Sequence, residues 1–221
     1  MSYCVFQYHA KTDIETLRRS LLDLFREGIE SQRPIAQSEF KKKIPQLHYG
    51  SYPVRAEKNV DASLDALHWK YSELTGKYCG CQYWSAEAKA LFEKSLDGHG
   101  RNPTPKEVRE IIRCLQKKTR KEDPADLRKL RIEHEHVFPR ADLRGKLLQD
   151  RDALLASGCL KAVIDRLATG CVVLKSEHDL VDKIPGDDSN PWLRYKGLIR
   201  LAENKNWDPL QRDLIEKAGL L

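Results

Sequence analysis

The sequence contains no uninterrupted apolar run near the roughly 20 residues that a membrane-spanning helix needs. Residues 1–10 also lack the order of charged, apolar and small residues that is typical of a secretory signal peptide. These absences favour a cytoplasmic protein that has no membrane partner. In that compartment we expect the six cysteines to be reduced thiols rather than disulfides.

Two metal-binding patterns are also missing. No Cys-x-x-Cys pair occurs, so the standard zinc knuckle is excluded. Cys79 and Cys81 form a tighter Cys-Gly-Cys pair, for which we prefer small core thiols over a structural Zn²⁺ site. The absence of a His-Glu-x-x-His helix disfavours a zinc hydrolase of small substrates.

The composition is ordinary for a globular protein, with 40% apolar and 33% charged residues in 221. A chain of this length can bury a core as one large domain or as two small ones. Helical spacing dominates, and the clearest strand patterns are at 131–138 and 170–174. We therefore predict a mostly helical α+β fold. The helical segments are 13–28, 61–76, 85–96, 104–115, 142–156 and 159–167, with later helices from Ser176, Pro191 and Pro209.

Shorter features are expected between these segments. Residues 40–44 and 47–52 are predicted to be short extended pieces, and a short helix is predicted from Asp123. Trp192, Tyr195 and Ile199 share one helical face and are expected to pack in the core. We prefer the core to a nucleic-acid surface for Arg194 and Lys196 as well.

Positive charge is concentrated in one segment. Residues 101–131 contain eleven Lys/Arg and five Asp/Glu, an excess equal to the formal net charge of +6 of the whole chain. Such a segment suits a polyphosphate partner, because each neutralised phosphate releases counterions. A solvated helix face is the alternative. The candidate phosphate-binding residues in this segment are Lys117, Lys118, Arg120, Lys121 and Arg131.

The segment that follows carries the densest chemistry of the chain. Glu133, His134, Glu135 and His136 are consecutive within a predicted strand, so the two histidines should share one face and the two glutamates the other. A structural strand rarely places four ionisable groups in its middle, since burying them unpaired is costly. An exposed edge strand is the structural alternative.

A short apolar strand over 171–174 and a helix carrying His178 follow this segment. Glu135-His136-Val137-Phe138-Pro139 resembles the Asp/Glu-His-aliphatic-x-Pro motif of the ββα-metal (HNH-like) nucleases, and the resemblance to restriction or defence-type bacterial members extends over 131–184. It implies a ββα-metal core, two short strands and a helix, embedded in a helical scaffold. It also implies an endonuclease that hydrolyses DNA, with RNA as an alternative substrate.

The resemblance assigns roles to individual residues. His136 would be the general base that activates water. Glu135 and His178 would bind one divalent ion, Mg²⁺ or Mn²⁺, and Arg140 and Arg131 would contact phosphate. His134 is either a further metal ligand or, as we prefer, a residue that supports the ligands.

The chain departs from the family at one position. Family members carry an Asn or a similar residue near the second strand, but residues 137–177 contain no Asn, so that Gln149, Thr169 or Ser176 would have to replace it.

Two regions are expected. Residues 101–221 would form the nuclease-like region. Residues 1–100 would form a helical N-terminal region for substrate binding or for a homodimer contact. The alternative is a non-catalytic nucleic-acid-binding or regulatory protein in which 133–136 is a structural metal clip.

Overall fold

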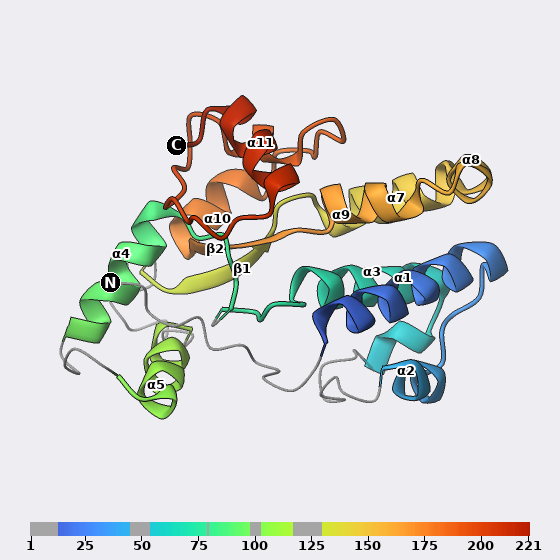
Figure 1. Cartoon of the computed structure of the whole chain (residues 1–221), viewed down its shortest axis with the longest axis horizontal. Helices are drawn as coiled ribbons and strands as arrows, with labels where there is room; N and C mark the ends of the chain where they lie inside the picture. The colour runs from blue at the N-terminus through green and yellow to red at the C-terminus, as the bar shows by residue number, and fades with distance from the viewer. Residues whose placement is uncertain (1–12, 45–53, 79, 98–102, 117–129) are drawn as a thin grey trace. The chain divides into compact units, whose positions relative to one another are not determined.

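The computed structural model describes residues 13–44, 54–78, 80–97, 103–116 and 130–221 (Figure 1). These residues form two compact units, each assembled from separated parts of the chain. The first unit contains described residues of 75–137 and 170–221, and the second contains those of 13–74 and 138–169. The boundaries of these units do not coincide with the predicted boundary at residue 100. The assignment of 1–100 to substrate binding or dimer contact and of 101–221 to the nuclease-like region stays a prediction. In the described residues, no helix is long and apolar enough to cross a membrane.

The second unit is helical and has a single large apolar core. α1 (Ile14–Ser31) and α3 (Val60–Ser72) pack together, and α1 also contacts α8 (Arg151–Ser157) and α9 (Leu160–Leu167). α7 (Arg140–Gln149), α2 (Gln37–Lys43) and the 3₁₀ turn η2 (Val54–Glu57) complete the unit. Leucine, isoleucine and phenylalanine side chains fill this core. Its rim carries an ion pair of 2.8 Å between Arg144 and Asp65.

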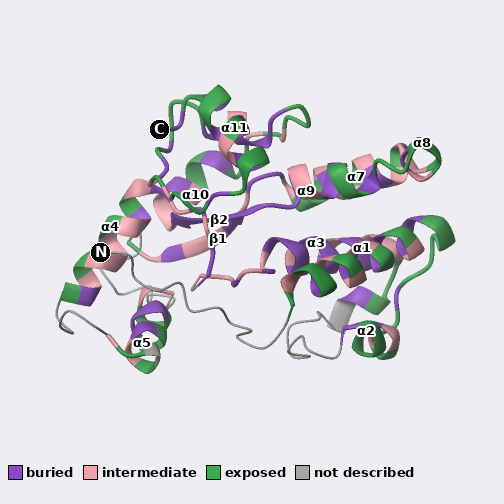
Figure 2. Ribbon diagram, in the orientation of Figure 1, coloured by how far each residue is buried: buried purple, intermediate pink, exposed green. Residues whose placement is uncertain are grey.

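The first unit contains the sheet. β1 (Ile132–His136) and β2 (Gly170–Leu174) pair antiparallel, with Glu135 opposite Cys171 and His136 opposite Gly170. β2 is buried at every position, as Figure 2 shows, and its apolar sequence suits a strand that is covered on both faces. The main chain of residues 83–85 covers the far edge of β2, where Val172 N donates to Tyr83 O and Ser85 N donates to Val172 O.

Helices lie on both faces of this sheet. α10 (Lys175–Val181) follows β2 directly and packs on β1 and β2, and α4 (Ala86–Asp97) contacts β2 and α5 (Pro105–Leu115). The 3₁₀ turn η3 (Pro191–Tyr195) and α11 (Pro209–Ala218) contact each other. The chain is thus mostly helical with a small antiparallel sheet, as predicted, and β1, β2 and α10 occur in the order strand, strand, helix.

Alternation along β1 and β2 gives the sheet two different faces. Val137, Cys171 and Val173 belong to an apolar cluster with Trp192 and Tyr195, and we call this side the α10 face. On the other side, the cluster around Ile132, Val172 and Leu174 includes Ala88 of α4 and Ile112 of α5, and we call this side the α4 face.

Several sequence predictions need correction. Residues 40–43 are helical rather than extended, because Phe40 and Ile44 lie one turn apart and both enter the core of the second unit. The segment 142–156 contains parts of two helices, α7 and α8, which meet at Asp150. The chain between β1 and β2 therefore holds three helices rather than two. The predicted pieces at 47–52 and from Asp123 lie outside the described residues.

Two helix starts also differ from the prediction. α10 begins at Lys175 rather than at Ser176, because the Glu177 carboxylate accepts a hydrogen bond of 2.8 Å from Leu174 N. The segment from Pro191 is a 3₁₀ turn that ends at Tyr195, although Trp192, Tyr195 and Ile199 are buried as predicted. The helices predicted over 85–96 and 104–115 are present and begin with side-chain caps, since Ser85 Oγ accepts from Ala88 N and Thr104 forms a capping box with Glu107.

Candidate active site

Glu135 and His178 meet where β1 packs against α10. The distance between Glu135 Oε2 and His178 Nε2 is 3.0 Å. Glu135 is the fourth residue of β1 and is buried on the α10 face, whereas His178 is the fourth residue of α10 and is partly exposed. The two residues that the motif predicts as metal ligands are therefore brought together, and one of them remains accessible to solvent.

Glu133 lies on the same face as Glu135. Its Oε2 atom is 4.0 Å from His178 Nε2, and its other oxygen forms an ion pair with Arg131. The alternation predicted for β1 is confirmed by these contacts, since both glutamates approach α10. Arg131, predicted to contact phosphate, has its guanidinium engaged by Glu133 in this structure.

Arg194 is the other charged side chain at this position, and it is buried. Its Nη1 atom is 3.1 Å from Glu135 Oε1, so the two oxygens of Glu135 face different cations. Burying a charge without a partner costs free energy, and removing one partner of a buried ion pair costs roughly 3–5 kcal/mol. Arg194 therefore compensates the buried negative charge of Glu135.

Electrostatics favour the protonated form of His178. The hydrogen bond with Glu135 raises the pKa of His178, and the negative charges of Glu135 and Glu133 act in the same direction against the effect of burial. Burial raises the pKa of the neighbouring Glu177, opposed by hydrogen bonds from Ser85 Oγ and Leu174 N. A cation that binds to His178 therefore competes with a proton, for which the site raises the affinity of this imidazole.

The two histidines of β1 lie on the other side of the strand. The rings of His134 and His136 are 5.6 Å apart in an edge-to-face arrangement, and the ring of Tyr78 is 6.3 Å from that of His134. Tyr78 packs against the α4-face cluster. The structure therefore does not bring His136, the predicted base, into the group formed by Glu135 and His178, nor does it bring His134 there.

The other predicted residues lie elsewhere. Arg140 begins α7 in the second unit, where its guanidinium lies 5.7 Å from the centroid of the Trp69 ring. Cys81 is a buried free thiol, whereas Cys79 lies outside the described residues. Gln149 and Thr169 belong to the second unit, and Ser176 lies on α10. The basic residues Lys117, Lys118, Arg120 and Lys121 are also outside the described residues.

The donor set at this site fits a divalent ion in part. Two neighbouring ligands of an octahedral ion with bonds of about 2.1 Å lie about 3.0 Å apart, which is the separation of Glu135 Oε2 and His178 Nε2. Carboxylate oxygen and imidazole nitrogen suit Mg²⁺ or Mn²⁺. Within the described ranges, no group of three or more His, Cys, Asp or Glu side chains is arranged to hold a metal ion. The fit therefore rests on two protein ligands.

The pairing of Arg194 with Glu135 was not predicted from the sequence, because it joins residues from distant parts of the chain. The core assignment is confirmed for Arg194, which is buried, and is wrong for Lys196, which is exposed just after η3. A charged residue between Trp192 and Tyr195 was the available signal. Comparison with known proteins adds no further candidates, because the chain matches no family model, no curated protein and no solved structure.

Proposed function

We propose that this chain is a metal-dependent endonuclease that hydrolyses phosphodiester bonds in DNA. The observation that carries the proposal is the approach of Glu135 from β1 to His178 from α10 at 3.0 Å. These are the two residues that correspond to the acid and the helix-borne histidine of the ββα-metal motif. The order of β1, β2 and α10 also supports the assignment, because it is the order of elements in that motif.

Glu135 and His178 would hold the ion, with Glu133 adding negative charge beside them. When bound, a divalent ion would polarise the scissile phosphate and stabilise the leaving oxygen. Arg194 neutralises one oxygen of Glu135 and leaves the other facing His178. His178 can act as a ligand only as the neutral imidazole, so ion binding would compete with protonation of this side chain.

The base is assigned by the motif alone. His136 would remove a proton from the attacking water, which is a contribution of typically 10²–10⁴-fold to the chemical step. Its position at the end of β1 is fixed through its main chain, because Arg194 Nη1 donates a hydrogen bond of 2.9 Å to His136 O. The alternation of β1 directs its imidazole to the α4 face, whereas Glu135 and His178 meet on the α10 face.

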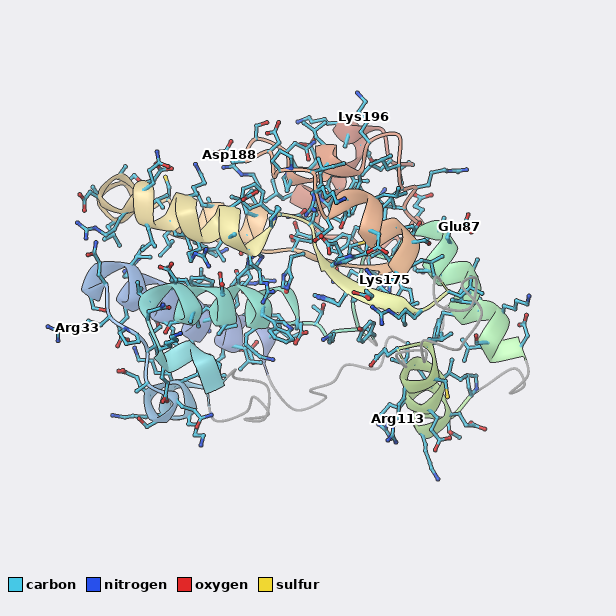
Figure 3. The ribbon with its side chains drawn as sticks, turned by 180° about the vertical axis from the view of Figure 1, so that it is seen from behind. Arg33, Glu87, Arg113, Lys175, Asp188 and Lys196 are labelled. Atoms are coloured by element: carbon cyan, nitrogen blue, oxygen red, sulfur yellow. The ribbon has the colours of Figure 1, made fainter. Side chains whose placement is uncertain are left out.

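Substrate binding is proposed for the basic segment 101–131. In its described part, Lys106, Arg109 and Arg113 are exposed on α5, and Figure 3 shows Arg113 projecting from this helix. The apolar side chains of α5 point the other way, since Val108, Ile111 and Ile112 are buried. A cationic face backed by an apolar one can contact a phosphate backbone without disturbing the fold.

Plasmid cleavage tests the proposal. The parent protein should cut DNA with Mg²⁺ or Mn²⁺ and should not cut it with EDTA. Glu135→Gln and His178→Asn should each lower the rate by about 100-fold or more and weaken Mn²⁺ binding measured by calorimetry, because two protein ligands are few for a hydrated ion. Asp182→Asn is the matched control, since this exposed acid lies just beyond α10, and it should behave like the parent.

The outcomes separate the alternatives. Cleavage that persists in EDTA would refute the metal requirement and leave Glu135 and His178 as a carboxylate–imidazole pair acting without an ion. Binding of DNA and Mn²⁺ without cleavage would support the non-catalytic alternative, a nucleic-acid-binding protein with a metal clip. Full activity in both variants would move the reaction away from this part of the sheet.

A further inference from the structure

Arg194 is a buried charge at the candidate site, and both of its Nη atoms have partners, whereas its Nε has no hydrogen-bond partner among the described residues. Its side chain is 2% exposed. Besides the ion pair with Glu135, it donates hydrogen bonds to three main-chain carbonyls, those of His136 at 2.9 Å, Val137 at 3.3 Å and Val181 at 2.5 Å. A side chain so enclosed cannot reach a nucleic acid, so its function must act through the groups that it touches.

These groups belong to the two elements that carry the candidate ligands. His136 and Val137 are at the end of β1, directly after Glu135, and Val181 is the last residue of α10, which carries His178. The planar fork of a guanidinium can serve several acceptors at once in a fixed geometry, which an ammonium group cannot do. Arg194 therefore ties the end of β1 to the end of α10.

The contact with Glu135 adds an orienting effect. Because Oε1 of Glu135 faces Arg194, Oε2 faces His178. Rotation of the carboxylate would break the contact with the guanidinium inside a buried environment, where both charges need their partners. The conformation of Glu135 is thus set by Arg194 before any cation arrives.

We propose that Arg194 is a positioning residue that orients Glu135 and fixes its distance from His178, so that the pair is ready to bind a divalent ion. The inference rests on the proposed function. It goes beyond that function because it assigns the organisation of the site to a residue outside the motif. Residues that orient metal ligands typically contribute 10–100-fold to metal affinity.

The test measures Mn²⁺ binding directly, by electron paramagnetic resonance of free Mn²⁺ in a titration of the folded protein. Arg194→Lys keeps the charge and loses the fork, and it should raise the Kd for Mn²⁺ by about tenfold or more. Arg212→Lys is the matched control. Arg212 is partly buried and forms ion pairs with Glu203 and Glu216 rather than with Glu135. The Kd of the Arg212→Lys variant for Mn²⁺ should stay within twofold of the parent value.

A merely structural role predicts a different pattern. It would lower the melting temperature of Arg194→Lys and leave the Kd unchanged under conditions where the variant is folded, which would overturn the inference. The positioning role also predicts that saturating Mn²⁺ restores most of the cleavage rate, so that the metal requirement changes more than the maximal rate does.

The result for the parent separates the inference from the proposed function. If the parent binds no Mn²⁺, the proposed function loses its metal site and the inference fails with it. If the parent binds Mn²⁺ and Arg194→Lys binds it with the same Kd, only the inference is overturned. If Arg194→Lys does not fold, Arg194→Gln replaces it, because its amide can still donate to carbonyl oxygens. Failure of both variants to fold would assign Arg194 a structural role only.

Discussion

The two faces of the β1–β2 sheet use the same strands and differ in what they bury. On the α10 face, Glu135 and Arg194 are buried charges that pair with each other, and His178 completes the group at the surface. On the α4 face, the buried contacts are mainly apolar and aromatic, and the imidazoles of His134 and His136 lie there beside Tyr78. The charges thus gather on one face and the imidazoles of β1 on the other.

This difference separates the proposed cation site, on the α10 face, from the proposed base, on the α4 face. A buried carboxylate held by an arginine suits a preorganised cation site, because the free-energy cost of desolvation is already met by fixed partners. The motif, however, places its base on a residue whose side chain lies on the other face. Either the proposed reaction uses both faces at the end of β1, or it is confined to the α10 face.

The largest expected effect comes from His136. His136→Ala should lower the turnover of DNA cleavage by about 10²–10⁴-fold, because it removes the proposed base, while Mn²⁺ affinity stays near that of the parent. Single-turnover cleavage and Mn²⁺ calorimetry on the same preparation measure the two quantities. The result would show that the α4 face takes part in the reaction.

His134→Ala is the matched control for this substitution. His134 is on the same face and its ring contacts that of His136. If His134 only supports the base, His134→Ala should lower the turnover less than His136→Ala does. If His136→Ala cleaves at the parent rate, the base assignment fails and the reaction is confined to the α10 face.

A smaller effect is expected for substrate binding. α5 packs in the α4-face cluster through Ile112 and carries described cations of the basic segment, so we expect this segment to contact the DNA backbone. Each phosphate contact contributes about 0.9 to the slope of log K against log salt for duplex DNA. Replacing four cations by Gln should therefore flatten the slope and weaken binding to all duplexes alike. The four positions are Lys117, Lys118, Arg120 and Lys121.

The control for this measurement replaces cations outside the basic segment. Arg200, Lys205 and Lys217 are exposed and can be changed to Gln together. Their removal should leave the slope near that of the parent. A slope that is unchanged in the quadruple variant would show that its cations form a solvated face and would remove this segment as a binding surface.

Local patterns predicted the elements that carry the site. The alternation of residues 132–136 predicted the two faces of β1, and the apolar run from Gly170 to Leu174 predicted β2, because both patterns depend only on the period of a strand. The approach of Glu135 and His178 was expected from the resemblance to the ββα-metal motif and not from a local pattern. The two strand predictions succeeded because the features they use are contained within a few residues.

Features that depend on distant partners could not be predicted in this way. The pairing of Arg194 with Glu135 requires η3 to lie against the end of β1, and no local pattern specifies that packing. The same holds for Glu177, whose partner Ser85 precedes α4. The helix at 37–43 was missed for a related reason, since the burial of Phe40 and Ile44 depends on a core formed by other helices.

The smallest effect concerns pH and probes the α10 face without a metal ion. Glu135 raises the pKa of His178 in the folded protein above its ordinary value near 6.5. When the pKa of a histidine is higher in the folded than in the unfolded state, protonation stabilises the folded state. This stabilisation is complete at a pH below the pKa of the unfolded state, and it is lost as the pH rises through the pKa of the folded state. His178→Gln should therefore reduce the free energy of unfolding more at pH 6 than at pH 9, measured by urea denaturation in EDTA.

Glu135→Gln supplies the background that isolates this effect. Without the carboxylate, the main cause of the raised pKa is gone, so the cost of His178→Gln should depend much less on pH. Glu133 remains at 4.0 Å and should leave a small residual dependence. In the parent background, the loss of free energy of unfolding caused by His178→Gln could be independent of pH or could grow towards pH 9. Either result would show that Glu135 and His178 do not form an ion pair in the metal-free protein. The α10 face would then lose the feature that distinguishes it from the α4 face.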